Sequence, residues 1–222
     1  MSAVTDETGL RAALTAALRR LDRLGLNRGS TGNLSHRCSV DGRAGMLITP
    51  TGMGADDMQP GDWVWLGDDG SQVGAWEPSS EWAIHRAIYQ DRPELQAVVH
   101  THSVNATAVA CLRRDLPPFH YMVAVAGGDS VRCAPYHLFG SQALSAAVVE
   151  AMQGRLACLL ANHGLVAAAA TLAQAVKVAQ EIEALCEVYL KALAVGQPAI
   201  LDADAMAEVL ERFSRYGQTS RR

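Results

Sequence analysis

The chain has 222 residues, 49% hydrophobic and 19% charged, so it is long and apolar enough to bury a core and is unlike a disordered segment. Its formal net charge of −4 lacks the basic field on which nucleic-acid binding depends. The five cysteines are scattered and odd in number and form no CxxC pair, which is typical of reduced thiols in a cytoplasmic protein.

The first predicted element is an amphipathic helix over about residues 5–26. Its sequence has no continuous apolar core and carries acids among its arginines, so it is not typical of a cleavable signal peptide. Elsewhere no apolar run approaches the length needed to span a membrane. We therefore expect a soluble cytoplasmic protein with neither a membrane nor a nucleic-acid partner.

Strand candidates follow at NLSHR (33–37), GMLITP (45–50) and DWVWL (62–66), each bounded by glycine, aspartate or proline. The segment SSEWAIHRAIYQ (79–90) predicts a helix with two serines at its cap and Glu81 in its first turn.

In the second half of the chain, LQAVVH (95–100) predicts a buried strand and VNATAVACL (104–112) a helix of small residues. RLACLLANHG (155–164) predicts a second buried strand that ends in a turn at His163. Two more helices are expected, over about residues 171–195 and 203–216. Helices and buried strands interleave without a linker, which predicts one three-layer α/β domain over residues 1–222.

Two histidines, His100 and His102, close the first buried strand. Side chains at i and i+2 of a strand point to the same face, so the two imidazoles supply half of a tetrahedral metal site. Alone this pattern also fits ordinary polar residues at a strand exit. His163 ends the second buried strand in the same way, and three histidines with an open position are the pattern of catalytic zinc.

Glu81 follows Ser79 and Ser80, whose hydroxyls and nearby backbone amides make a helix start suited to an anion. A carboxylate beside such a site is unfavourable for stability, but a base beside a bound phosphate ester explains it. The glycine-bearing turns GSTGN (29–33) and TPTG (49–52) offer further hydroxyls and close backbone approach.

Seven segments occur together and in order: RGSTGNLSHR, LITPTG, PSSEWAIH, VVHTHS, FHYMVAVAGGDSVRCAPYHLFGS, NHGL and RFSRYG. With them the chain closely resembles the class II (zinc-dependent) aldolase/adducin family from about Leu24 to Gly217. The resemblance implies a three-layer α/β/α domain around a mixed, mainly antiparallel sheet. The sequence departs from the family by a longer loop around CSVDGRAG and by Asn162, where aldolases often have another histidine.

The resemblance also implies the ligands. One zinc ion per subunit is expected on His100, His102 and His163, with Glu81 as the catalytic acid/base and a fourth ligand before substrate binds. The substrate's phosphate is expected to contact one set of residues: Gly32, Asn33, Thr51, Gly52, Ser79 and Ser80.

Other roles implied by the resemblance lie at subunit boundaries. Family members of this type are homotetramers, in which a tyrosine matching Tyr121 comes from a neighbouring subunit and handles the proton on the substrate's C4 oxygen. Phe139 and Tyr216 match positions that line or close over the aldehyde side.

The implied activity is zinc-dependent retro-aldol cleavage of a ketose 1-phosphate to dihydroxyacetone phosphate and an aldehyde. Candidate substrates are L-fuculose 1-phosphate and the 5-deoxy and 5-methylthio pentulose 1-phosphates. Three alternatives stay open: a 4-epimerase, for which aspartate rather than Glu81 is expected, a dehydratase or decarboxylase on related sugar phosphates, and a non-catalytic adducin-like interaction module.

Overall fold

The computed structural model describes residues 7–215. Its helices are α1 (Glu7–Arg23), α2 (Trp82–Asp91), α3 (Val104–Cys111), α4 (Gln142–Ala151), α5 (Leu172–Val195) and α6 (Ala203–Ser214), with 3₁₀ turns η1 (Pro60–Asp62) and η2 (Tyr121–Ala126). Its strands are β1 (Asn33–Val40), β2 (Arg43–Ile48), β3 (Val64–Gly67), β4 (Gln72–Val73), β5 (Ala97–Thr101), β6 (Cys133–Ala134), β7 (Ala157–Leu160) and β8 (Gly164–Ala169).

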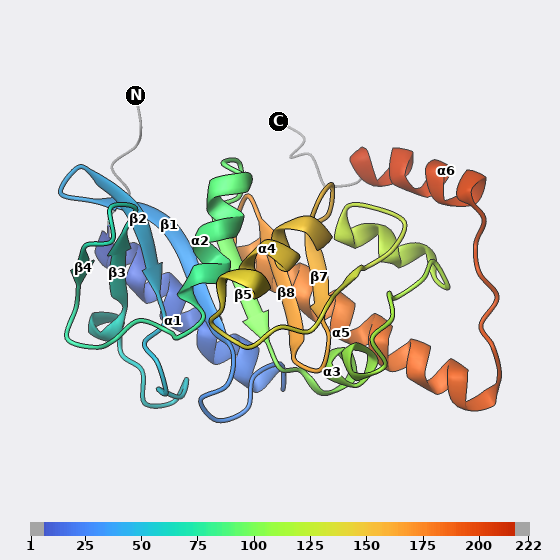
Figure 1. Cartoon of the computed structure of the whole chain (residues 1–222), viewed down its shortest axis with the longest axis horizontal. Coiled ribbons are helices and arrows are strands. Elements are labelled where there is room, and N and C mark those ends of the chain that lie inside the picture. The colour runs from blue at the N-terminus through green and yellow to red at the C-terminus, as the bar shows by residue number, and fades with distance from the viewer. Residues whose placement is uncertain (1–6, 216–222) are drawn as a thin grey trace, which may run out of the picture.

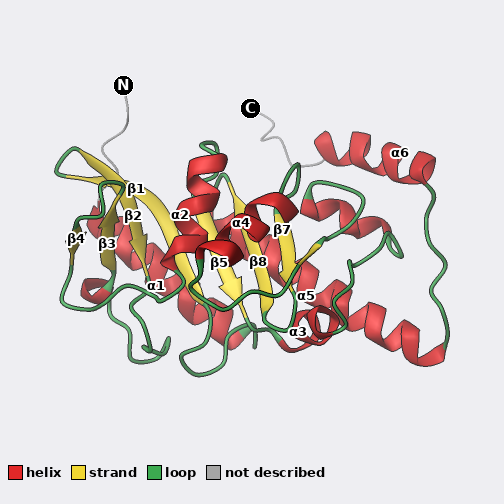
Figure 2. Ribbon diagram, viewed as in Figure 1, coloured by secondary structure: helices red, strands yellow, loops and turns green. Residues whose placement is uncertain are grey.

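All eight strands join one sheet in the order β4-β3-β2-β1-β5-β8-β7-β6. Every neighbouring pair is antiparallel except β6 and β7, which run parallel, so the prediction of a mixed, mainly antiparallel sheet is confirmed. In Figure 1, α2 and α4 lie in front of the sheet, and α1 and α5 lie behind it. Figure 2 shows the resulting three layers, helices on both sides of the strands, as the sequence predicts.

Each face of the sheet has its own hydrophobic core, because side chains alternate along a strand. In β5, Ala97 and Val99 pack with residues of α1, α3 and α5, whereas Val98 packs with residues of α2 and α4. By this alternation His100 points to the α2 and α4 face, which is where the start of α2 places Glu81.

The sequence did not predict α4, β8, the two-residue strands β4 and β6, or the 3₁₀ turns η1 and η2. Strand β8 contains Ala167, Ala168 and Ala169, and alanine is depleted in strands and favoured in helices. In the fold β8 lies between β5 and β7, with α5 packed on it, and all three alanines are buried. Tertiary packing therefore outweighs the local preference here.

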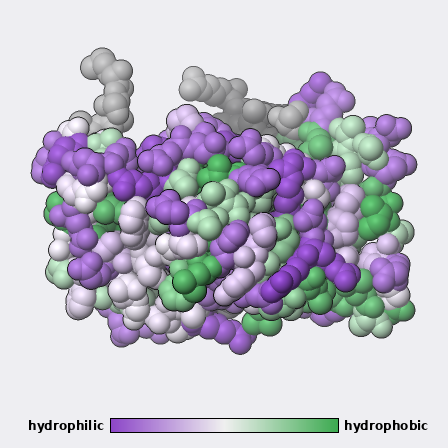
Figure 3. Space-filling model, viewed as in Figure 1, coloured by the Kyte–Doolittle hydropathy of each residue, from purple (hydrophilic) through white to green (hydrophobic). Residues whose placement is uncertain are grey.

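Among residues 7–215, none of the helices combines the length and the hydrophobicity that crossing a membrane requires. The molecular face that carries α2 and α4 is a mosaic of hydrophilic and hydrophobic residues (Figure 3).

Stability of the core behind the sheet can be tested at Thr15 of α1. Its buried hydroxyl accepts a hydrogen bond from Trp63 Nε1 at 2.9 Å and donates one to the Arg11 carbonyl. Thr15→Val leaves the indole N–H without a partner, which we expect to lower the free energy of unfolding by about 1–3 kcal/mol. Denaturant unfolding measures this, and metal content is expected to stay at the wild-type value.

Candidate metal centre

Strand pairing brings the three predicted histidines together at one end of the central strands β5, β7 and β8. His100 lies in β5, His102 follows the end of β5, and His163 lies in the turn between β7 and β8. Because β8 runs antiparallel to both β5 and β7, the C-terminal ends of β5 and β7 lie on either side of the start of β8. At Gly164 a β-carbon would lie 2.3 Å from the Thr101 carbonyl oxygen and 3.1 Å from the His102 ring, so only glycine allows this approach.

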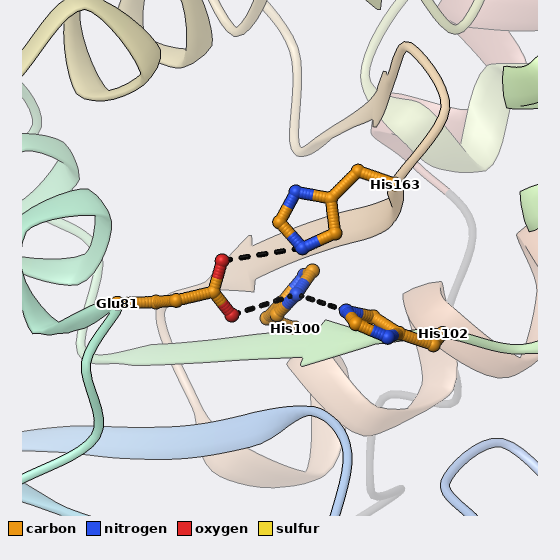
Figure 4. Close-up of side chains that lie close together, drawn as sticks. All are labelled: Glu81, His100, His102 and His163. Atoms are coloured by element: carbon orange, nitrogen blue, oxygen red, sulfur yellow. Dashed lines mark hydrogen bonds and ion pairs between the residues drawn. The ribbon is translucent and has the colours of Figure 1, made fainter. Parts of the chain in front are cut away.

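The three imidazoles surround one point. Their ring centroids are mutually 4.8 Å apart, with interplanar angles between 74° and 80°. The Nε2 atoms of His100 and His102 are 2.9 Å apart, and Figure 4 shows all three rings turned toward the Glu81 carboxylate.

Glu81 completes the cluster from α2. Its Oε2 lies 3.1 Å from His100 Nε2, and its Oε1 lies 3.2 Å from His163 Nε2. The sequence predicted Glu81 in the first turn of this helix, but in the structure it is the N-cap residue of α2, and its side chain makes no capping hydrogen bond. Glu81 is 7% exposed, and its carboxylate is turned toward the histidines instead of the helix amides.

The electrostatics of the cluster favour an ionised carboxylate and a neutral ring. Burial alone would raise the pKa of Glu81, but the neighbouring imidazoles of His100 and His163 lower that pKa well below its ordinary range. Burial, together with the neighbouring His100 and His163, lowers the pKa of His102 to about 4. Ionised carboxylate and neutral imidazole are the forms that bind a metal ion.

The donor set fits a divalent metal. Ligand atoms of Glu81, His100, His102 and His163 all lie within 4.8 Å of one another, and two ligands of one tetrahedral zinc ion are expected about 3.3 Å apart. His100 Nδ1 donates to the Leu165 carbonyl at 2.9 Å, which leaves Nε2 free as a ligand. Glu81 Oε1 is buried, and its polar neighbour among the described residues is His163 Nε2 at 3.2 Å, itself a predicted ligand, as expected of an atom that serves a metal.

A cavity of about 360 Å³ opens beside the cluster. Its lining includes all six residues expected to hold phosphate: Gly32, Asn33, Thr51, Gly52, Ser79 and Ser80. Glu81, His102 and His163 line it as well, whereas His100 is fully buried behind them. The structure thus brings the predicted metal ligands and the predicted phosphate contacts to one place.

Backbone hydrogen bonds hold the two hydroxyl-bearing loops of the cavity together. Ser79 N donates to the Thr49 carbonyl at 2.9 Å, and Thr51 N donates to the Glu77 carbonyl at 3.0 Å. The third loop turns at Gly32, where φ is +75° and a β-carbon would lie 2.7 Å from the His100 carbonyl oxygen. This close approach requires glycine and presses the loop against β5.

The remaining predicted site residues are placed differently. Phe139 lines the cavity and is 61% exposed. Tyr121 begins η2, which packs against α5 and α6. The Tyr121 residue is 50% exposed and is not among the described residues that line the cavity. Tyr216 lies outside the described residues.

Sequence reasoning missed part of the lining and the support behind Glu81. Ser30 and Thr31 of the predicted GSTGN turn line the cavity, and so do Tyr136 and His137, for which the segment APYHLFGS gave no local signal. His85 was missed because a lone histidine on a helix is unremarkable, yet it is fully buried and hydrogen-bonded to Asn33.

Comparison with known proteins agrees with this geometry. Residues 12–190 match the model of the class II aldolase and adducin N-terminal domain. The chain belongs to the class II aldolase/adducin family. A 5-methylthioribulose-1-phosphate/5-deoxyribulose-1-phosphate aldolase of Rhodospirillum rubrum is 47% identical over 95% of this chain and 94% of its own.

Two further relatives carry a different substrate name. An L-fuculose phosphate aldolase of Escherichia coli is 45% identical over 89% of this chain and 90% of its own. The solved structure of an L-fuculose 1-phosphate aldolase superposes with a TM-score of 0.87 at 37% identity, covering 93% of this chain and 96% of that one. The prediction of family and fold from the sequence is confirmed.

We expect the purified protein to hold about one divalent metal ion per chain, because three imidazoles and one carboxylate converge there. Replacing His100, His102 and His163 together by alanine should abolish this metal, measured by elemental analysis after gel filtration. His36→Ala is the matched control, since His36 lies in β1 and its ring bonds the Arg37 carbonyl. Full metal content in the triple variant would refute the assignment.

Proposed function

We propose that this protein cleaves a ketose 1-phosphate by a retro-aldol reaction to dihydroxyacetone phosphate and an aldehyde. The observation that carries the proposal is the convergence of three imidazoles and a buried carboxylate beside a cavity walled by hydroxyl and amide groups. The relatives named for aldolases acting on phosphorylated ketoses support the same reaction class.

In this proposal zinc is the metal, one ion per chain, held by His100, His102 and His163, with Glu81 as a further ligand until substrate enters. Nitrogen ligands with one carboxylate suit zinc. When bound, the ion supplies Lewis acidity that polarises the substrate carbonyl and stabilises the negative charge left by carbon–carbon cleavage.

The protein's own groups then move the protons. Glu81, buried and ionised beside the histidines, first takes up a proton through the cavity that it lines, and it gives this proton to the C3 carbon after the C3–C4 bond breaks. The proton gained by C3 balances the one lost from the C4 hydroxyl. Tyr121 accepts the proton of the C4 hydroxyl. The phosphate is held by Ser79, Ser80 and Thr51 with neighbouring backbone amides, which supplies positioning and remote binding energy rather than chemistry.

Tyr121 reaches a site only if it comes from another subunit, because in its own chain it lies outside the cavity lining. Its exposure supports the homotetramer that the family resemblance implies, with active sites at subunit interfaces. We propose a homotetramer for this reason. We propose a cytoplasmic location on a separate ground, the five scattered free cysteines.

The aldehyde half of the substrate is the open choice. Identities of 47% and 45% to relatives with different substrate names do not separate L-fuculose 1-phosphate from 5-deoxyribulose or 5-methylthioribulose 1-phosphate. Phe139 and its neighbours Tyr136 and His137 line the same cavity and are the residues we propose for contacts with this half.

The test is an assay of dihydroxyacetone phosphate release across these three ketose 1-phosphates and their non-phosphorylated counterparts. We expect cleavage of at least one phosphorylated ketose, weak cleavage of the free sugars, and loss of activity on chelation that zinc restores. Equal cleavage of free and phosphorylated ketoses would contradict the phosphate site, and no cleavage of any phosphorylated ketose would refute the function.

A second experiment separates Glu81 from Tyr121. Glu81 is expected to exchange the carbon-bound proton of dihydroxyacetone phosphate without any aldehyde, whereas Tyr121 serves only the C4 oxygen. Glu81→Gln should therefore lose both cleavage and solvent deuterium exchange. Tyr121→Phe should lose cleavage by roughly 10²–10⁴-fold, the scale of a general acid/base loss, and keep exchange.

The same pair of variants tests the shared site. Mixed oligomers of Glu81→Gln and Tyr121→Phe chains contain interfaces with one intact copy of each residue, so part of the activity should return. Loss of exchange in Tyr121→Phe would contradict the division of roles, and no rescue in verified mixed oligomers would show that each chain builds its own site.

A further inference from the structure

Behind Glu81 a chain of buried polar groups runs through the core between the sheet and α2. Asn33 Nδ2 donates to Glu81 Oε2 at 3.0 Å, and Asn33 Oδ1 lies 2.5 Å from His85 Nε2. His85 Nδ1 lies 2.6 Å from Ser35 Oγ, which lies 2.9 Å from the Tyr89 hydroxyl. We call these five residues the buried polar chain.

Because these residues are buried, the donor and the acceptor in the hydrogen bonds of the buried polar chain can be assigned. His85 and Ser35 have no exposed surface, Asn33 has 3% and Tyr89 has 5%. Burial, and secondarily His100, lowers the pKa of His85 to about 3, so the ring is neutral near pH 7 and carries hydrogen on one nitrogen. Burial raises the pKa of Tyr89, so its hydroxyl keeps its hydrogen.

The geometry at Asn33 fixes the order of donors. Its Nδ2 donates to Glu81 Oε2, so its oxygen, which can only accept, is turned toward His85. His85 Nε2 therefore carries the ring hydrogen and donates, and Nδ1 accepts from the Ser35 hydroxyl. The donors of Ser35, His85 and Asn33 therefore all point toward Glu81. The Tyr89 hydroxyl lies 2.9 Å from Ser35 Oγ and 3.3 Å from the Gln96 carbonyl oxygen, and either atom can accept its hydrogen.

A polar chain of this kind is costly in a core unless every group is satisfied, and apolar side chains would pack there at lower cost. One end of the buried polar chain lies at the metal centre, because Glu81 Oε2 is close to both Asn33 Nδ2 and His100 Nε2. Without the His85 donor, the Asn33 amide can rotate by half a turn and place its oxygen against Oε2, which repels the carboxylate.

We propose that His85 is a positioning residue: its Nε2 hydrogen, donated to Asn33 Oδ1, locks the Asn33 amide in the orientation that holds the Glu81 carboxylate against the histidine cluster. This inference rests on the proposed function where it concerns catalysis. It concerns the geometry of the metal centre independently of any substrate.

Two substitutions at one position separate positioning from packing. Glutamine carries its amide nitrogen close to the position of histidine Nε2, whereas asparagine carries its amide close to Nδ1. His85→Gln therefore keeps a donor for Asn33, and His85→Asn does not. Both lose the ring, so both are expected to lower the unfolding temperature.

We expect His85→Asn to lower kcat roughly 10–100-fold, the range for outer partners of metal ligands, with KM for the ketose phosphate nearly unchanged. The zinc dissociation constant of the metal-free protein, measured by chelator competition, should rise by a similar roughly 10–100-fold. His85→Gln should retain most of both. Thr15→Val is the control that destabilises the other core and should leave both values at wild type.

Equal losses in the two His85 variants, or wild-type kcat and zinc affinity in His85→Asn, would overturn the proposal. Ser35→Ala repeats the test with the ring in place, because without the Ser35 donor the ring hydrogen can move to Nδ1. We expect smaller losses of kcat and of zinc affinity in this variant. Unchanged values would count against the positioning role of His85. If wild type cleaves no ketose phosphate, the proposed function fails, and the zinc affinities still decide the role of His85.

Discussion

The register of β5 is the constraint on which the site depends. His100 lies opposite Asn33 of β1 on one side and Val166 of β8 on the other, in the middle of an eight-stranded sheet. A slip by one residue would turn His100 to the face of α1, α3 and α5 and separate it from Glu81. The β5–β8 pairing also sets where the β7–β8 turn lies, and so places His163.

Much of this site could be predicted from the sequence because its residues obey simple periodicity. His100 and His102 share a strand face by their spacing, and His163 follows a second apolar run that could be recognised as a buried strand. Glu81 stood out because two serines precede it at a helix start. Local chemistry of this kind can be recognised in the sequence alone, and the segments that carry it also made the family recognisable.

The parts that could not be predicted depend on partners distant in the sequence. Strand β8 is rich in alanine and becomes a strand only between β5 and β7. His85 and Ser35 are ordinary residues until the sheet and α2 pack together and bury both. Tyr121 is an exposed residue of η2 in its own chain, and the role proposed for it needs a second chain, which the sequence indicates only through the family resemblance.

The two edges of the sheet have a consequence for how copies of this chain can associate. Both edge strands, β4 and β6, are two residues long, so each edge offers very few unpaired backbone groups to an incoming strand. A strand of a second molecule therefore finds few backbone partners at either edge. This protects the sheet, whose interior is very apolar, from edge-to-edge aggregation. Ordered association is left to helices, loops and side chains, surfaces that can be made specific for one partner and one geometry.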